Sequence, residues 1–387
     1  MRILLVHERY RERGGEDAAV DGEIAQLRDA GVDVATLIED NDRIRGEGSL
    51  GLALNTLWSP AGRRAVAAAI RSARPDLVHV HNFFPLLSPS IYGAVHDAGL
   101  PVVQTLHNYR LICPGALLLR DGGACELCVE RRIKWPAVRH ACYRTSHAAS
   151  ATVAAMDGLH SLLGTFRRRV DRFIALSLTA AQQFVRGGIP AAQIAVIPNA
   201  VADPGPPRMD GRSGALFVGR LSPEKGLDTV LAAWRHIDWP LTVIGDGPDA
   251  ARLKAAAPAQ VRFLGRRSPD QVAQAMAGAE LLVFPSLCRE NLPTVILEAM
   301  AHGVPVLASG GGAAEDMILP DVSGALAPPG DVAVWRDAIA TLRSDPVRRA
   351  GLAREGRAAY EAHYTPSRVV ARRLALYRAL LEERRTP

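Results

Sequence analysis

The sequence has 387 residues, more than one hydrophobic core normally organises, so we expect two domains. Hydrophobic residues make up 48% and charged residues 22%, a balance that excludes a largely disordered chain. The net charge of +6 would attract anions, but aromatic residues are only 5% and do not interleave with basic ones, so nucleic-acid binding is not expected.

The start of the chain bears on where the protein works. An apolar run follows Met1 and Arg2 and then turns charged, without the small-residue cleavage site of a signal peptide. No uninterrupted apolar stretch reaches the roughly 20 residues that a bilayer requires. We therefore expect a cytoplasmic protein, or one peripheral on the cytosolic face of a membrane.

The first half of the sequence alternates short apolar runs with segments of helical spacing, the pattern of βαβ units with a parallel sheet. A helix is predicted from Asp17 to Ala30, with Gly31 closing it. The predicted strands are short, apolar and bounded by turn residues: 3–6, 32–38, 77–81, 101–107 and 172–177. We interpret residues 1–200 as one Rossmann-like domain.

Residues 201–214 break this pattern with Pro, Gly and Asp, a composition typical of an interdomain linker. A second series then predicts the strands 215–220, 241–247, 261–265, 281–286 and 305–309. Residues 215–365 therefore form a second Rossmann-like domain, and 366–387 form an amphipathic helix that packs back across the hinge. The expected fold class is α/β, with two doubly wound parallel sheets facing across a cleft.

Ligands of open α/β sheets bind beyond the carboxyl ends of the strands, so residues after each apolar run are candidate site residues. Gly14 and Gly15 follow the first strand, where backbone N–H groups can approach an anion at a helix start; a simple tight turn is the alternative. Asp246 and Gly247 form a similar turn after a later strand. A lone Gly-x-Gly is a weak signal.

Arg220 and Lys225 flank a turn, shaped by Pro223 and Gly226, that follows the strand 215–220 and opens a helix. Two cations beside a helix start suit a pyrophosphate. Solvated surface side chains are the usual explanation for a single cation, but the pair at the carboxyl end of a strand favours a ligand.

Glu290 and Glu298 are the most informative pair of acids. They are eight positions apart, slightly over two helical turns, so both would point into one cleft if the helix began near Asn291. Glu298 has apolar neighbours, among which an ionised carboxylate must find hydrogen-bond donors such as ribose hydroxyls. The alternatives are a structural ion pair for Glu298 and a charge complementing the helix dipole for Glu290.

Taken in order, these motifs resemble the family-4 retaining glycosyltransferases of the GT-B fold over nearly the whole chain. Each motif alone is common, and their order makes the match specific. The matching segments are the Gly14-Gly15 loop, His107 in QTLHN, IPNAV around Asn199, GRLSPEKG, GDGP, FLG, the Glu290-x7-Glu298 pair, EAMAHGVPV, GGAAEDM near Glu315 and SGALAPPGD.

The resemblance implies roles for these residues. The catalytic group would comprise Arg220 and Lys225 on the donor diphosphate, Glu290 on the transferred sugar, and His107 near the reacting carbon. Glu298 would bind the ribose hydroxyls. The remaining donor-binding residues would be Gly14, Gly15, Asn199, Gly219, Asp246, Gly247, Asn291, Leu292, Pro293 and Thr294. The sequence departs from the family at Asn291-Leu292-Pro293, where a glycine commonly follows the first glutamate, and Pro293 cannot donate a backbone hydrogen bond.

The implied reaction moves a sugar from a nucleotide-diphosphate donor to an acceptor hydroxyl with retention of configuration, in the biosynthesis of a polysaccharide, glycolipid or other glycoconjugate. Residues 1–200 would bind the acceptor and 215–365 the donor. No catalytic metal is expected, because the two cations and helix termini would neutralise the diphosphate. Alternatives are a nucleotide-sugar epimerase or phosphorylase of the same fold, and a non-catalytic sugar-nucleotide-binding protein. A dinucleotide-dependent oxidoreductase is disfavoured, because no GxGxxG follows the first strand.

A cysteine-rich insertion occupies about residues 110–147. Its four thiols, Cys113, Cys125, Cys128 and Cys142, include a Cys-x2-Cys chelate spacing and could close a structural zinc site. Free cysteines and a redox pair are the alternatives. A subset of the resembled family carries a similar stretch, which suggests a subgroup.

The same insertion carries basic residues around Trp135, namely Arg131, Arg132, Lys134 and Arg139. They could bind an anionic or lipid-linked acceptor, or could form a solvated basic face. The nucleotide base, the sugar, the acceptor and the linkage are not determined by these patterns.

Overall fold

The computed structural model describes residues 1–12, 14–46, 48–208 and 210–384. It divides into two compact units. The N-terminal unit comprises Met1–Leu118, Glu126–Asn199 and Val369–Pro387, and the C-terminal unit comprises Leu119–Cys125 and Ala200–Arg368. Each unit contains one six-stranded parallel sheet, and these two sheets confirm the predicted fold class.

The sheet of the N-terminal unit has the order β2-β1-β3-β4-β7-β8. Its strands are β1 (Arg2–Arg9), β2 (Asp33–Asp40), β3 (Leu77–Val80), β4 (Val102–Leu106), β7 (Arg172–Ala175) and β8 (Ile194–Val196). Ile3 to Val6 of β1 are at most 1% exposed, because this central strand is covered on both faces.

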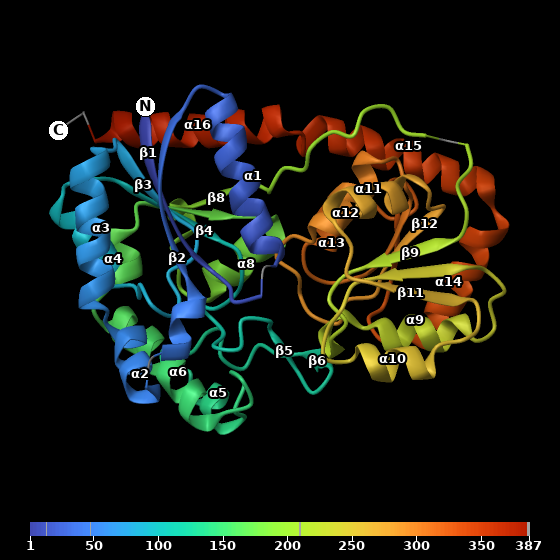
Figure 1. Ribbon diagram of the computed structural model, residues 1–387, viewed down its shortest axis with the longest axis horizontal. Helices are drawn as coiled ribbons and strands as arrows, with labels where there is room; N and C mark the ends of the chain where they lie inside the picture. The colour runs from blue at the N-terminus through green and yellow to red at the C-terminus, as the bar shows by residue number, and fades with distance from the viewer. Residues whose placement is uncertain (13, 47, 209, 385–387) are drawn as a thin grey trace. The chain divides into compact units, whose positions relative to one another are not determined.

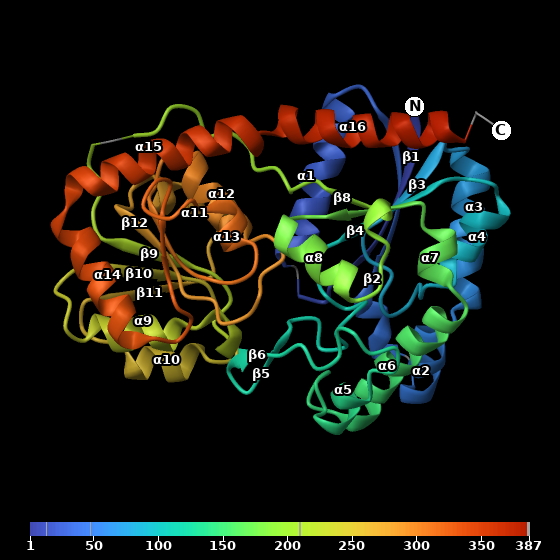
Figure 2. The same ribbon diagram turned by 180° about the vertical axis from the view of Figure 1, so that it is seen from behind.

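The helices of this unit are α1 (Gly15–Asp29), α2 (Ser49–Leu57), α3 (Pro60–Ala73), α4 (Ile91–Asp97), α5 (Trp135–Arg139), α6 (His147–Leu162), α7 (Thr165–Arg169) and α8 (Leu178–Arg186). Figure 1 and Figure 2 both show α3 and α4 on one face of the sheet and α1 on the other. This arrangement follows from the right-handed crossovers, since the chain steps from β1 to β2 in one direction and from β2 across β1 to β3 in the other.

The sheet of the C-terminal unit has the order β11-β10-β9-β12-β13-β14. Its strands are β9 (Ala215–Val218), β10 (Leu241–Ile244), β11 (Val261–Gly265), β12 (Leu281–Phe284), β13 (Val306–Ser309) and β14 (Ala325–Ala327). Its helices are α9 (Leu227–Trp234), α10 (Ala250–Ala256), α11 (Pro269–Ala277), α12 (Thr294–Ala301), α13 (Ala314–Met317), α14 (Val332–Ser344) and α15 (Pro346–His363).

Two hydrophobic cores lie on opposite faces of this second sheet. One contains Trp234, Trp239 and Trp335, and the other contains Met300 and Tyr360. In Figure 1, α9, α10 and α14 lie on one side of the strands, and α11, α12 and α13 lie on the other. The strand order again reverses between β10 and β12, and the loops after β9 and β12 meet at that reversal.

The chain ends in α16 (Pro366–Glu383), whose residues from Val369 onward belong to the N-terminal unit. Arg373 and Tyr377 are at most 1% exposed, so this helix contributes polar side chains to the interior of that unit. A short hairpin of β5 (Leu119–Arg120) and β6 (Gly123–Ala124) belongs to the C-terminal unit. None of the helices in the described part of the chain is long and apolar enough to cross a bilayer.

Candidate active site

The loop after β9 holds Lys225 in a fixed conformation. Lys225 ends a single 3-10 turn, Pro223–Lys225, and Gly226 follows in the left-handed region with φ of 65°. A Cβ at Gly226 would lie 2.1 Å from the carbonyl oxygen of Pro285, which ends the neighbouring strand region. Glycine is therefore required here both by its φ and by the close approach of the two loops.

Lys225 and Glu290, two of the predicted catalytic residues, form an ion pair. Its Nζ lies 2.6 Å from Oε1 of Glu290, and the side chains are 26% and 19% exposed. Ser286 Oγ donates a hydrogen bond of 2.8 Å to the same oxygen, and Cys288 Sγ lies 3.5 Å from it. The carboxylate is thus oriented by three side chains and still reaches solvent.

The pair is ionised at neutral pH. Burial by itself would lower the pKa of Lys225, but the charge of Glu290 outweighs it and raises the pKa above its usual value. Burial would also raise the pKa of Glu290, but the charge of Lys225 outweighs it and lowers that pKa. The site therefore holds a full positive charge beside a full negative one at neutral pH.

The main chain of Glu290 is fixed by the loop after β13. Glu290 O accepts a hydrogen bond of 3.0 Å from the backbone N–H of Ala313. Gly312 has φ of 66°, and a Cβ there would lie 2.8 Å from the nitrogen of Glu290. The segment that contains Gly312 thus packs directly against Glu290. A larger residue in place of Gly312 would displace the main chain of Glu290.

Glu298 lies in α12 and differs from Glu290 in its surroundings. The structure gives its carboxylate no hydrogen-bond or ion-pair partner among the residues it describes, and burial raises its pKa. A partly buried acid without a protein donor is suited to accept hydrogen bonds from a ligand. The helix itself begins at Thr294 and not near Asn291, so Glu290 precedes α12 in a loop. The predicted helix start near Asn291 was therefore three residues too early.

Pro293 occupies the position just before α12, with φ of −75°. A proline at a helix start removes no intrahelical hydrogen bond, because the first N–H groups of a helix have no partner within it. The departure from the family motif at this position is therefore compatible with a regular α12, whose first N–H groups remain available.

Of the other predicted donor-binding residues of this unit, Asn291 and Pro293 are buried and Leu292 and Thr294 are partly buried, whereas those in the loops after β9 and β10 lie nearer the surface. Arg220 and Asp246 are exposed, and Gly219 and Gly247 are partly buried beside them. A Cβ at Gly247 would lie 2.3 Å from the carbonyl oxygen of Leu221, so the loops after β9 and β10 pack tightly. These loops lie at the carboxyl ends of neighbouring strands of the sheet.

Gly14, Gly15 and Asn199 belong to the N-terminal unit. Gly14 precedes α1, and its N–H donates a hydrogen bond of 3.0 Å to Asp17 Oδ2. A Cβ at Gly15 would meet no atom within 4 Å, so packing within the protein does not require glycine there. Asn199 is 5% exposed, and its Oδ1 has no hydrogen-bond partner among the described residues.

His107 follows β4 and lines a small cavity with Gln104, Asn108 and Arg110. Its Nε2 lies 2.8 Å from Nδ1 of His81. Burial lowers the pKa of His107 to about 3, although the nearby charge of Glu23 opposes the shift. His107 is therefore a neutral imidazole at physiological pH.

Comparison with known proteins decides the family. Residues 19–203 match the family described as Glycosyltransferase Family 4, and residues 212–345 match the family described as Glycosyl transferases group 1. A GDP-mannose-dependent alpha-mannosyltransferase of Mycobacterium tuberculosis is 30% identical over 334 residues, 85% of this chain and 79% of the relative. The chain belongs to glycosyltransferase family 4.

The chain is also similar to a second curated glycosyltransferase and, in its fold, to a solved structure. A 2-deoxystreptamine N-acetyl-D-glucosaminyltransferase of Streptomyces fradiae is 28% identical, with 79% of this chain and 72% of that protein covered. The solved sucrose-phosphate synthase of Thermosynechococcus elongatus superposes with a TM-score of 0.74 at 18% identity, covering 99% of both chains. This family-4 protein is a retaining glycosyltransferase that uses a nucleotide-sugar donor, which confirms the predicted enzyme class over the oxidoreductase alternative.

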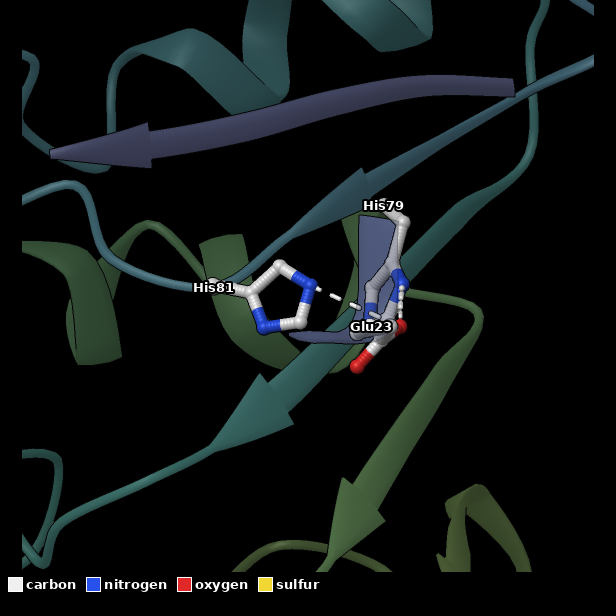
Figure 3. Close-up of side chains that lie close together, drawn as sticks. All are labelled: Glu23, His79 and His81. Carbon is white, nitrogen blue, oxygen red and sulfur yellow. Dashed lines mark ion pairs between the residues drawn. The ribbon is translucent and has the colours of Figure 1, made fainter. Parts of the chain in front are cut away.

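Several polar residues near His107 in this glycosyltransferase were missed by sequence reasoning. Figure 3 shows that the side chains of Glu23, His79 and His81 gather in the N-terminal unit. The alternation of His79 and His81 in a buried strand could have indicated two imidazoles pointing the same way. The sequence pattern contains no comparable signal for Glu23, which lies in a helix.

The four cysteines of the insertion do not form a close cluster in the glycosyltransferase. No three of them have sulfur atoms within 4.8 Å of one another, whereas the thiolates of a tetrahedral zinc site lie about 4 Å apart. Burial, together with the nearby Cys113 and Cys142, raises the pKa of Cys128 to about 11. The structure therefore gives no support to the zinc site, which stays a prediction, as does membership of a cysteine-rich subgroup.

Lys134 was expected on a basic surface of the insertion, but it is only 4% exposed. Its Nζ donates a hydrogen bond of 2.8 Å to the carbonyl oxygen of Cys128. Lys134 thus ties the segment that contains Cys128 to the start of α5, and it is not available to an external anion.

Proposed function

We propose that the donor diphosphate binds beside Lys225 and Arg220, with Glu290 contacting hydroxyls of the transferred sugar and Glu298 accepting hydrogen bonds from the ribose. The observation that carries this proposal is the ion pair of 2.6 Å between Lys225 and Glu290, only 26% and 19% exposed. A cation and a carboxylate fixed this closely present one group to phosphate and one to sugar.

Lys225 supplies positive charge at the point where the leaving group accumulates negative charge. Its pKa is raised, so it stays protonated throughout turnover. The acceptor hydroxyl attacks the anomeric carbon from the face that the diphosphate leaves, and a departing phosphate oxygen takes the hydroxyl proton. No protein nucleophile is needed, and the rate depends on charge that is already in place.

The composition supports a specific need for lysine at this position. Of the 46 basic residues only three are lysine: Lys134, Lys225 and Lys254. Lys134 is buried and Lys254 is exposed, so Lys225 is the one lysine beside the proposed donor site. A compact ammonium fits between the Glu290 carboxylate and a phosphate oxygen more readily than a planar guanidinium.

For the donor, we propose GDP-mannose as the first candidate, because the Mycobacterium tuberculosis relative is named for it. The test is thermal unfolding of the protein with UDP-, GDP-, ADP- and dTDP-sugars. A bound donor raises the unfolding midpoint, and its stabilising free energy grows with the logarithm of its concentration above Kd. The largest shift is expected with GDP-mannose; a larger shift with another sugar nucleotide would replace it, and no shift with any would contradict the proposed site.

For the acceptor, we propose an anionic or lipid-linked hydroxyl compound presented at a membrane surface. Ile133 is 71% exposed and Trp135 is 47% exposed, and Arg131 stacks on the Trp135 ring at 5.6 Å. Exposed apolar and basic side chains together favour the interface of an anionic bilayer.

This acceptor proposal is tested by co-sedimentation with vesicles of phosphatidylglycerol, using vesicles of phosphatidylcholine as the control. Wild-type protein is expected to bind the anionic vesicles, and Trp135→Ala with Ile133→Ser to bind at least about threefold less. Equal binding of the variant, or no preference for anionic lipid, would contradict a membrane acceptor. The double variant changes only exposed side chains, so its fold is not expected to change.

A further inference from the structure

A chain of buried polar side chains links the C-terminal helix to His107 within the N-terminal unit. Arg373 of α16 places Nη2 3.0 Å from Oε2 of Glu23. The other oxygen of Glu23 lies 3.2 Å from Nδ1 of His79 and 3.7 Å from Nε2 of His81 (Figure 3). His81 Nδ1 lies 2.8 Å from His107 Nε2. The elements that supply these groups are far apart in the sequence.

Glu23 is an anion in this interior. It is 2% exposed, and Arg373 beside it is 1% exposed. Burial would raise the pKa of Glu23, but the charge of Arg373, followed by the contribution of His79, holds it at about 2. A negative charge therefore faces His81 at neutral pH.

The donor atoms of this cluster argue against a metal ion. Both ring nitrogens of His79 are engaged, Nε2 with Thr105 Oγ1 at 2.8 Å and Nδ1 with the hydroxyl of Tyr377 at 2.8 Å. Arg373 already neutralises the carboxylate. A divalent cation would displace these hydrogen bonds and would lie close to the guanidinium, so the cluster has another role.

The position of Glu23 decides how the protons are placed on His81 and His107. Burial, with the neighbouring imidazoles, keeps the pKa of His81 well below its usual value, so both rings are neutral and each carries one proton. The carboxylate favours an N–H on the Nε2 of His81 that faces it. Nδ1 of His81 is then an acceptor, and the Nε2–H of His107 donates to it.

We propose that Glu23 and His81 are positioning residues that hold His107 as the neutral Nε2–H tautomer, which leaves its Nδ1 lone pair for a substrate hydroxyl. The structure gives Nδ1 of His107 no hydrogen-bond partner among the described residues, and the ring lines a cavity. The inference rests on the role near the reacting carbon that the family resemblance implies for His107. It extends that role, because it names the atom that acts and the residues that fix its state.

The first test reads the tautomer directly in the wild-type protein. In wild-type protein labelled with 15N-histidine, the ring of His107 is expected to show a pyrrole-type Nε2 and a pyridine-type Nδ1, with its signal assigned by loss in His107→Gln. The opposite tautomer, or an imidazolium at neutral pH, would overturn the proposal. This result does not depend on turnover, so it stays separate from the donor-site proposal.

The second test changes the acceptor of the His107 hydrogen bond. His81→Leu removes it, and His81→Asn can present an amide oxygen in its place. We expect His81→Leu to lower kcat/KM at least about tenfold with the donor KM little changed, since a wrong tautomer acts on the chemical step. His81→Asn should recover most of this loss. Equal losses in the two variants would indicate a purely structural role and would contradict the proposal.

Tyr377→Phe is the matched control. It removes a hydroxyl that contacts His79 in the same network but touches neither His81 nor His107. Its kcat/KM should stay within about twofold of wild type. A loss as large as that of His81→Leu would assign the effect to the network as a whole and overturn the specific role of His81. If His81→Leu does not fold, the tautomer measured in the wild type decides.

Discussion

The two units each contain a carboxylate paired with a cation, and the pairs differ mainly in exposure. Lys225 and Glu290 are 26% and 19% exposed, in the loops at the carboxyl edge of the second sheet. Glu23 and Arg373 are 2% and 1% exposed, inside the N-terminal unit. The first pair can exchange partners with a ligand, whereas the second pair cannot. In the two proposals, the first pair therefore serves binding and the second serves orientation.

This contrast separates the expected effects of substitution. Breaking the exposed pair should remove transition-state stabilisation and change protein stability little, because water can solvate the remaining charge. Breaking the buried pair should leave an uncompensated charge in the interior. Substitutions in the two pairs should therefore separate a loss of activity from a loss of stability.

The largest effect is expected for Lys225→Ala. The ammonium would no longer neutralise the leaving diphosphate, so kcat/KM should fall by about 10³-fold or more, measured as sugar transfer at saturating acceptor. The unfolding midpoint should stay close to that of wild type. Lys225→Arg should also lose most of the activity, because the planar guanidinium does not fit the same position beside Glu290.

Lys254→Ala is the matched control for Lys225→Ala, since it removes an exposed lysine of the same unit. Its activity should equal that of wild type. If Lys225→Ala retained normal kinetics, the donor diphosphate would have to bind elsewhere. A loss of activity accompanied by unfolding would instead place Lys225 among the structural ion pairs.

A large loss of stability is expected for Glu23→Gln. Arg373 would remain buried without an anion, so the free energy of unfolding at neutral pH should fall by about 3 to 5 kcal/mol in urea titrations. The pKa of Glu23 is lowered from 4.5 to about 2, so its stabilising contribution is fully present above pH 4.5. That contribution is lost as the pH falls toward 2, and the difference between wild type and variant should shrink over the same interval.

Glu383→Gln provides the comparison, because its ion pair, like that of Glu23, involves a residue of α16. Glu383 of α16 pairs with Arg172 at 2.7 Å, but the two side chains are 53% and 27% exposed. Its removal should cost less than about 1 kcal/mol. Equal losses of stability in Glu23→Gln and Glu383→Gln would show that burial does not distinguish the two pairs.

The predictions that succeeded were those for which nearby residues supply the signal. The strands were found because short apolar runs end in Gly, Pro or Ser, and the candidate donor residues were chosen because they follow those runs. The fold class and the enzyme class were confirmed, while the role of each residue remains a proposal. The start of α12 was misplaced, because the proline at its N-terminus was treated as a departure from the motif and not as a helix boundary.

The buried network could not be predicted from the sequence. Glu23, His81 and Arg373 come from α1, the end of β3 and α16, and only the fold brings them together. Lys134 was misassigned to a basic surface for the same reason, since its partner is a backbone carbonyl that no sequence pattern marks. Charged residues are usually exposed, and the exceptions depend on tertiary contacts.

The smallest effect is expected for Glu298→Gln. This variant should be more stable than wild type without ligand but should bind the donor more weakly. Burial raises the pKa of Glu298 and no described residue donates to its carboxylate, so the ionised group opposes folding at neutral pH. Since the pKa is raised, this unfavourable contribution grows as the pH rises through the pKa of Glu298. The ligand-free variant should therefore unfold slightly above wild type at neutral pH, and the gain should disappear under acidic conditions.

The donor KM of Glu298→Gln should rise by about tenfold, because an amide oxygen accepts hydrogen bonds from ribose hydroxyls less strongly than a carboxylate does. Glu355→Gln, an exposed acid of the same unit whose Arg354 partner is more exposed still, should change neither quantity. A variant more stable without donor but less stabilised by it would link the unpaired carboxylate to the ligand. A loss of stability in the ligand-free protein would instead mean that Glu298 has an internal structural role, and the ribose assignment would then be wrong.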